Sequence, residues 1–257
     1  MGSEIVEAAR RALGPVGAFL PVSTTSAPPI DLQRDAVRRL ERAGYRAAWT
    51  NEAVGGKDAL VQLAILLAAT ERMVFGTGIA NIWARSAQTA HGAATLLAQG
   101  YPGRFVLGLG VGYPEQAAST GREFGRPLAT LRDYLDRMSA PTQLPAPDVA
   151  YPRIIGANGP KMLALAGELT DGALPAMRPP EFTAQARQVL GPDKLLVIFM
   201  HASTGEGGPP ATTAAVRAHL AAGADHAIVG MPIGTEFSPG VDQLEQLAPA
   251  LAEVRPA

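Results

Sequence analysis

Short apolar segments alternate along the chain with longer segments in which apolar and charged residues recur at helical spacing. The apolar segments are rich in Val, Ile, Leu and Phe and lack regular polar alternation, which is typical of parallel strands covered on both faces. Eight of them are predicted to be strands: Gly17–Val22, Tyr45–Asn51, Met73–Ala80, Phe105–Val111, Arg153–Ala157, Gly172–Met177, Leu195–His201 and His226–Met231.

The intervening segments are predicted to be amphipathic helices. Leu32, Ala36, Val37 and Leu40 share one face of the first of these, with Arg and Glu opposite. Several helices begin with Pro, which suits a first helical turn because the N–H it lacks would have no helical partner there. The predicted helices are Asp31–Ala43, Asp58–Thr70, Ala87–Gln99, Pro127–Met138, Pro160–Leu169, Pro180–Leu190, Pro210–Ala222 and Val241–Val254.

Eight strand–helix units in strict alternation favour an α/β fold of the (β/α)8 TIM-barrel type. We expect one domain over residues 1–257, which is an ordinary length for such a barrel. A doubly wound open sheet is the alternative. If the barrel forms, its chemistry belongs at the C-terminal ends of the strands, in the βα loops.

Composition narrows the chemistry and the partners. The chain has 257 residues, a formal net charge of -1 and no cysteine, which excludes disulfides and thiolate nucleophiles. This near-neutral charge gives no sign of the basic surface that nucleic-acid binding requires. The first residues lack the apolar core of a secretory signal, and the longest apolar stretch, Leu60–Thr70, is too short to span a bilayer. We therefore expect a cytoplasmic protein that acts on a small molecule, with no nucleic-acid or membrane partner.

Three alternating glycines mark the predicted fourth strand, which reads GRFVLGLGVGYPEQ. Gly108, Gly110 and Gly112 share one face of this strand because side chains alternate with a period of two. Such glycines leave room either for a flat ring against the barrel wall or for large residues of neighbouring layers.

The fifth predicted strand runs into the turn Gly156-Ala157-Asn158-Gly159, and a helix begins at Pro160. Backbone N–H groups at a helix N-terminus can hold a phosphate. An ordinary tight βα turn uses the same residues.

Two loops carry further polar candidates. Glu52 ends the second strand beside Asn51, and we expect it to point into the barrel mouth, where a carboxylate can exchange a proton. Its alternative role is a helix cap or a solvent-facing acid. Trp83 and Arg85, in the third loop, form either a stacking wall with an anion contact or a plug on the barrel rim.

The histidines separate by position. His201 ends the seventh strand and is a candidate acid or base, whereas His226 begins the eighth strand and is expected to be structural. His91 and His219 fall within helices. Because the four do not cluster with carboxylates at ligand spacing, we expect no metal. No lysine is expected at a strand end, since Lys57 begins a helix.

Joined in order, three motifs resemble the coenzyme F420-dependent branch of the luciferase-like monooxygenase superfamily. They are AGYRAAWTNEAV, LAATERMVFGTGIANIWARSAQTAHGAATLLAQGYPGRFVLGLGVG and IIGANGPKMLALAGELTDGALP. The resemblance implies a barrel that holds F420, or FMN as the alternative, in its mouth. It also implies a homodimer.

The resemblance assigns residues as well. It implies a non-prolyl cis peptide near Gly78-Ile79 that presses on the cofactor ring. The cofactor contacts that it implies are Asn51, Gly78, Ile79, Ala80, Gly110, Val111, Gly112, Ala157, Asn158 and Gly159.

This chain departs from members of the branch in two places. Asn51-Glu52 stands where many members have an acid–His pair, and Tyr113 stands where some have a glutamate. Glu52 is therefore the expected proton-transfer residue, with Tyr113 or His201 as alternatives.

The expected reaction is hydride transfer between reduced F420 and an unidentified organic substrate. The alternatives are an FMN-dependent monooxygenase that uses O2, a catalytically silent cofactor-binding barrel and, last, a non-redox barrel that acts on a phosphorylated substrate.

Overall fold

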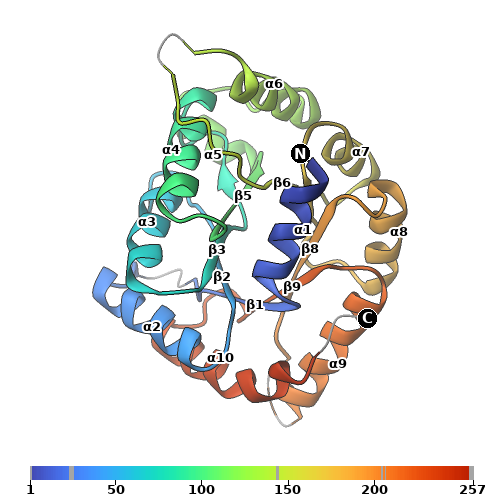
Figure 1. Ribbon diagram of the computed structural model, residues 1–257. Helices are drawn as coiled ribbons and strands as arrows, with labels where there is room; N and C mark the ends of the chain where they lie inside the picture. Colours follow the sequence, from blue (N-terminus) through green and yellow to red (C-terminus); the bar gives the residue numbers. More distant parts are fainter. Residues whose placement is uncertain (1, 23–25, 143–144, 204, 206, 255–257) are drawn as a thin grey trace.

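A closed parallel barrel forms the centre of the computed structural model, which describes residues 2–22, 26–142, 145–203, 205 and 207–254 (Figure 1). The strands are β1 (Val16–Phe19), β2 (Ala47–Thr50), β3 (Val74–Thr77), β4 (Ala80–Asn81), β5 (Phe105–Gly110), β6 (Arg153–Gly156), β7 (Gly172–Leu174), β8 (Leu195–His201) and β9 (His226–Gly230). They follow the order β3-β2-β1-β9-β8-β7-β6-β5-β4. The barrel closes because β3 also pairs with β5, in the register Phe75 to Phe105.

β3 and β4 are two pieces of the third barrel strand, since both pair in parallel with β5. The barrel therefore has eight strand positions, which confirms the predicted (β/α)8 fold and shows that the open-sheet alternative is wrong. Each predicted strand overlaps an observed one, and the observed strands are generally shorter at their C-terminal ends.

The helices of the described residues pack around the barrel, and one of them lies across its end (Figure 1). They are α1 (Gly2–Leu13), α2 (Ile30–Arg42), α3 (Ala59–Ala69), α4 (Ala87–Gly100), α5 (Pro114–Ala118), α6 (Pro127–Ser139), α7 (Pro160–Leu169), α8 (Pro180–Leu190), α9 (Gly208–Ala221) and α10 (Phe237–Ala252). All eight predicted helices are present, and α1 and α5 are additional. In the described part of the chain, no helix combines the length and the apolar character needed to cross a membrane.

The additional helix α1 crosses the barrel in Figure 1 and closes its N-terminal end. Val6, Ala9 and Leu13 are buried in the same apolar cluster as residues inside the barrel, such as Trp49. Arg10, on the same helix, donates a hydrogen bond of 2.9 Å to the carbonyl of Lys194, which precedes β8. The opposite, C-terminal end of the barrel is the one left for a ligand.

Candidate functional site

The C-terminal strand ends surround a mouth with an apolar floor. The rings of Phe19 on β1 and Phe199 on β8 lie 4.8 Å apart inside the barrel. The side chain of Ile79 lies beside β5 and β6, so that a β-carbon added at Gly110 would come within 2.8 Å of its Cδ1 atom. Ile79 and Phe199 are half-buried, so this floor is partly exposed to solvent.

The glycines of β5 make room for protein and not for a ring. A β-carbon at Gly108 would lie 2.0 Å from the carbonyl oxygen of Thr77, and one at Gly110 would meet Ile79. Gly112 has a φ of +56°, and a β-carbon there would meet the side chain of Gln116. The alternative of a ring lying directly against these glycines is wrong, because the third strand occupies that space at Gly108 and Gly110 and the side chain of Gln116 occupies it at Gly112. A contact of Gly110, Val111 or Gly112 with the edge of a cofactor stays a prediction.

The third strand breaks where the resemblance implied. The peptide bond between Gly78 and Ile79 is cis, and Ala80 follows as the buried start of β4. The N–H of Gly78 donates to the carbonyl of Thr50 at 2.8 Å, and the N–H of Glu52 donates to the carbonyl of Ile79 at 3.0 Å. Main-chain hydrogen bonds to the end of β2 thus fix the position of the residues between β3 and β4.

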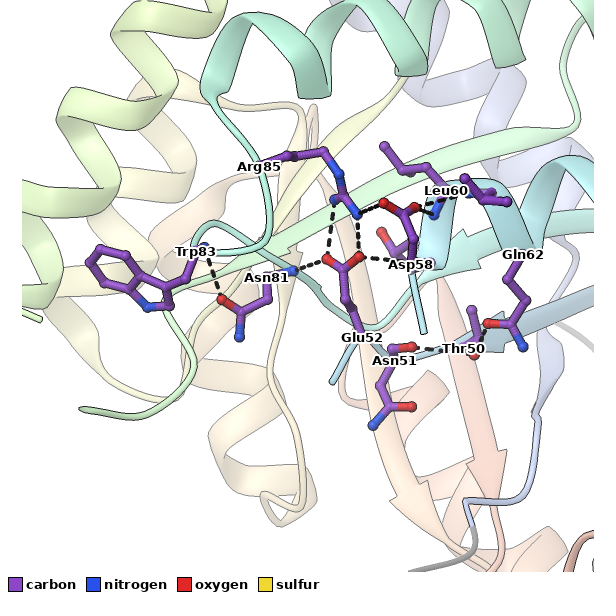
Figure 2. Close-up of polar contacts among 12 residues, drawn as sticks. Thr50, Asn51, Glu52, Asp58, Leu60, Gln62, Asn81, Trp83 and Arg85 are labelled. Atoms are coloured by element: carbon purple, nitrogen blue, oxygen red, sulfur yellow. Dashed lines mark hydrogen bonds and ion pairs between the residues drawn. The ribbon is translucent and has the colours of Figure 1, made fainter. Parts of the chain in front are cut away.

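Glu52 does not point into the mouth, contrary to expectation. Its side chain is fully buried and forms an ion pair with Arg85. Its carboxylate also accepts the N–H groups of Ala59 at 2.9 Å and Asn81 at 2.7 Å. Glu52 and Asn51 point in opposite directions from the end of β2 (Figure 2). The reason is the period of two, which places successive side chains on opposite faces. The expectation that Glu52 lies in the mouth is therefore wrong, and its contact with the first residue of α3 fits the helix-capping alternative.

Asn51 is the residue at the end of β2 that faces away from this ion pair. Its Oδ1 atom is buried and has no hydrogen-bond partner in the described part of the chain. An unpaired buried acceptor costs on the order of 1–3 kcal/mol. A ligand that brings an N–H or O–H donor into the mouth would remove this cost, so Asn51 fits a polar heterocycle.

His201 and Tyr113 lie apart. His201, half-buried at the end of β8, packs edge-on to Phe199 with ring centroids 5.4 Å apart, and burial lowers the pKa of its imidazole. Tyr113 is 71% exposed and precedes α5. Of these two candidates, His201 is the one that contacts the floor of the mouth.

The turn before α7 has its predicted position at the end of β6. Gly159 is the N-cap residue of α7, without a side-chain cap, and Pro160 begins the helix. Asn158 accepts the N–H of Ala176 at 2.8 Å, and Ala157 is buried. The Asn158 side chain is therefore engaged with the chain after β7, and a phosphate would depend on main-chain N–H groups. That role stays a prediction.

Trp83 is a plug on the rim, as its second alternative stated. It is buried, and its Nε1 donates to the carbonyl of Val111 at 2.7 Å. Arg85 is engaged with Glu52 and with Asp58, so it is not available as an anion contact.

The remaining histidines have partners inside the fold. His226 is fully buried between the indole of Trp49 and the carbonyl of Gly14, in agreement with its expected structural role. His91 contacts Tyr151, and His219 contacts Thr183. No cluster of potential metal ligands occurs among the described residues.

Lys57 is a residue whose position the sequence did not reveal. Its Nζ donates to the hydroxyl of Thr50, the last residue of β2, at 2.7 Å, so a lysine does reach a strand end. Thr50 also donates to Gln62 of α3, which places this lysine between the barrel and its helices and outside the mouth. Burial lowers the pKa of Lys57 to about 8, although the nearby Glu52 opposes this shift.

The protein is thus a (β/α)8 barrel whose candidate site lies at the C-terminal strand ends, where barrels of this class carry their chemistry. The family model for luciferase-like monooxygenase matches residues 15–190, which is more than half of the chain. The chain therefore belongs to the luciferase-like monooxygenase family.

Individual relatives that the chain matches have less than 30% sequence identity to it. The chain is 29% identical over 196 residues to a Mycobacterium tuberculosis protein provisionally named a coenzyme F420-dependent oxidoreductase, a match that covers 64% of this chain and 56% of the relative. The chain spans about half the length of the curated relatives it matches, 51% and 56% for two of them.

Solved structures share the fold at low sequence identity. An F420-dependent secondary alcohol dehydrogenase bound to an F420–acetone adduct has a TM-score of 0.71 at 15% identity, covering 93% of this chain and 99% of that one. The oxygenating constituent of 3,6-diketocamphane monooxygenase from Pseudomonas putida, bound to FMN, has a TM-score of 0.72 at 13% identity and covers 95% and 99%.

Proposed function

We propose that the protein is an F420-dependent oxidoreductase that transfers a hydride between the deazaflavin and a small organic substrate. The observation that carries this proposal is the buried, unpaired Oδ1 atom of Asn51, at the same strand ends as the half-buried Ile79 and Phe199. A planar heterocycle with apolar faces and polar edges matches both features. The F420-related names of one relative and one structural neighbour support the same cofactor.

Each part of the mouth has a role in this proposal. Ile79 and Phe199 would contact the faces of the bound molecules, and Asn51 would accept a hydrogen bond from a ring or substrate donor. The main-chain N–H groups at Gly159 would hold the phosphate, favoured by the dipole of α7. When bound, F420 would exchange the hydride at its ring carbon C5, accepting it when a hydroxyl substrate is oxidised, while the protein would supply position and proton transfer.

His201 is the residue that we assign to proton transfer. Burial lowers the pKa of its imidazole, so it is neutral near pH 7 and can accept a proton from a hydroxyl substrate. Glu52 is held by Arg85 and two N–H groups, and Tyr113 lies in solvent, so both suit this role less well.

FMN is the second candidate cofactor, and with it the protein would be a monooxygenase that uses O2. The family name and the FMN-bound structural neighbour favour this candidate. A barrel that binds either cofactor without turnover is the remaining possibility.

Titration of F420, followed by its fluorescence, and of FMN, followed by its absorbance, tests the proposal. We expect saturable binding of F420 at micromolar protein and weaker binding of FMN. The Asn51→Leu variant should bind F420 at least about tenfold more weakly, the equivalent of 1.4 kcal/mol. The Gln188→Leu variant, which changes an exposed amide on α8, is the matched control and should bind like the wild type. Absence of saturable binding for both cofactors would end the proposal.

We also propose that the protein is a homodimer formed through α3 and α4. These two helices pack side by side and contain no Asp, Glu, Lys or Arg. Val61 on α3 is 60% exposed and Leu96 on α4 is 61% exposed. An uncharged apolar face can meet its own copy without like-charge repulsion, as a two-fold interface requires.

A further inference from the structure

The wall of the mouth formed by residues 78–81 is held by main-chain hydrogen bonds to the end of β2. Thr50 accepts the N–H of Gly78 at 2.8 Å, and Ile79 accepts the N–H of Glu52 at 3.0 Å. A third bond comes from a side chain, because the Glu52 carboxylate accepts the N–H of Asn81 at 2.7 Å. Ile79, which forms part of the floor, is therefore held at its own carbonyl and lies between the bonded N–H groups of Gly78 and Asn81.

Both oxygens of the Glu52 carboxylate are engaged (Figure 2). Oε1 accepts from the N–H of Ala59 at 2.9 Å and from Arg85. Oε2 accepts from the N–H of Asn81 at 2.7 Å and from Arg85 Nη1 at 3.1 Å. A carboxylate that satisfies four donors in fixed directions defines the positions of the elements that carry them.

Arg85 extends this arrangement to α3. Its side chain is only 8% exposed, and it also contacts Asp58 at 2.7 Å. Asp58 in turn caps α3 by accepting the N–H groups of Leu60 and Val61 at 2.9 and 3.0 Å. One group of three charged residues thus joins the end of β2, β4 and the first turn of α3.

A buried ion pair contributes little net stability compared with well-packed apolar residues of similar volume, because both charges lose their hydration. Apolar residues could fill this space, but they could not accept the N–H of Asn81. The carboxylate at this position therefore fixes the place of residues 78–81 through a directional hydrogen bond, which an apolar side chain cannot form.

We infer that Glu52 and Arg85 act as positioning residues that set the place of Ile79 and Ala80 against the cofactor ring. The inference rests on the proposed function for the identity of the ligand. It replaces proton transfer as the role of Glu52. It also predicts that removing the pair weakens the binding of F420 by more than the loss of folding stability explains.

The test is the double variant Glu52→Leu/Arg85→Met, which removes the pair without leaving a buried charge unpaired. The matched control is Arg132→Met/Glu168→Leu, which removes an exposed ion pair between α6 and α7. Three quantities are measured: the melting temperature, the hydrogen-exchange protection of the Asn81 amide and the Kd for F420. We expect the double variant to melt below the wild type, because the N–H groups of Ala59 and Asn81 lose their acceptor. It should lose protection at Asn81 and, at a temperature where it is fully folded, bind F420 at least tenfold more weakly. The control should match the wild type in all three.

An unchanged Kd in a folded double variant would overturn the inference while leaving the proposed function intact. If the double variant does not fold, Arg85→Lys serves instead, because lysine keeps the charge but cannot form the paired contact with Glu52. It should raise the Kd for F420 severalfold, and wild-type affinity would overturn the inference. If the wild type binds neither F420 nor FMN, the proposed function fails. Asn81 protection that persists in the double variant would then overturn the positioning role separately.

Discussion

The buried His226 makes stability depend on pH in a way that can be calculated from its surroundings. Its Nε2 accepts from Trp49 Nε1 at 3.0 Å, because an indole nitrogen is only a donor. Its Nδ1 therefore carries the proton and lies 2.7 Å from the carbonyl oxygen of Gly14. A second proton on this ring would have no acceptor and would place a charge inside the barrel.

Burial accordingly lowers the pKa of His226 from 6.5 to about 4, although the hydrogen bond to Gly14 opposes the shift. Between these two values the unfolded chain binds more protons than the folded one, so the free energy of unfolding falls as pH falls. With about 1.4 kcal/mol per pKa unit, the loss between pH 7 and pH 4 is roughly 3 kcal/mol.

Urea unfolding of the wild type and of His226→Gln, measured from pH 7 to pH 4, tests this calculation. Glutamine offers one acceptor and one donor but does not titrate. We expect the variant to lose less stability than the wild type across this range, by a difference of roughly 3 kcal/mol. His91, His201 and His219, whose pKa values burial also lowers, contribute to both proteins and cancel in the comparison. Parallel pH profiles for the two proteins would refute the reasoning.

Three further predictions concern the barrel and its surface. Leu13→Ala should destabilise the protein by about 3 kcal/mol, because Leu13 is fully buried against the N-terminal end of the barrel. The control Arg11→Ala, at an exposed position of the same helix, should change stability by under about 0.5 kcal/mol. Equal effects of the two changes in urea unfolding would contradict the role of α1. Val61→Asp should convert a dimer into a monomer, as measured by sedimentation velocity. The control Val189→Asp, at an exposed position of α8, should leave the dimer intact. A wild type that is already monomeric would refute the proposed interface. Gly108→Ala should cost about 2 kcal/mol, because its β-carbon would lie 2.0 Å from the main-chain oxygen of Thr77, and an unchanged melting temperature would exclude this close approach.

The barrel was predictable because its strands and helices carry strong local patterns. Apolar runs mark β1 to β9, and Pro160 and Pro180 begin α7 and α8 as predicted. The helix α1 was not predicted, although Val6, Ala9 and Leu13 lie on one side of it. These residues are buried by contacts with the far end of the barrel, and no local pattern shows that contact.

The direction of Glu52 follows from the period of two once the inward direction of Trp49 is known. Trp49 and Asn51 share one face of β2 by the period of two, and Trp49 is inside the barrel, so Glu52 had to lie on the other face. The glycines of β5 were ambiguous for a different reason. Gly110 shows that space is needed, but only the fold shows that Ile79 fills it.

A crystal structure of the protein with F420 tests the central claim most directly. The account predicts a deazaflavin ring over Ile79 and Phe199, a ring or substrate donor within about 3 Å of Asn51 Oδ1 and a phosphate at the N-terminus of α7. Density for F420 anywhere outside the mouth, or a mouth that stays empty at saturating F420, would contradict it.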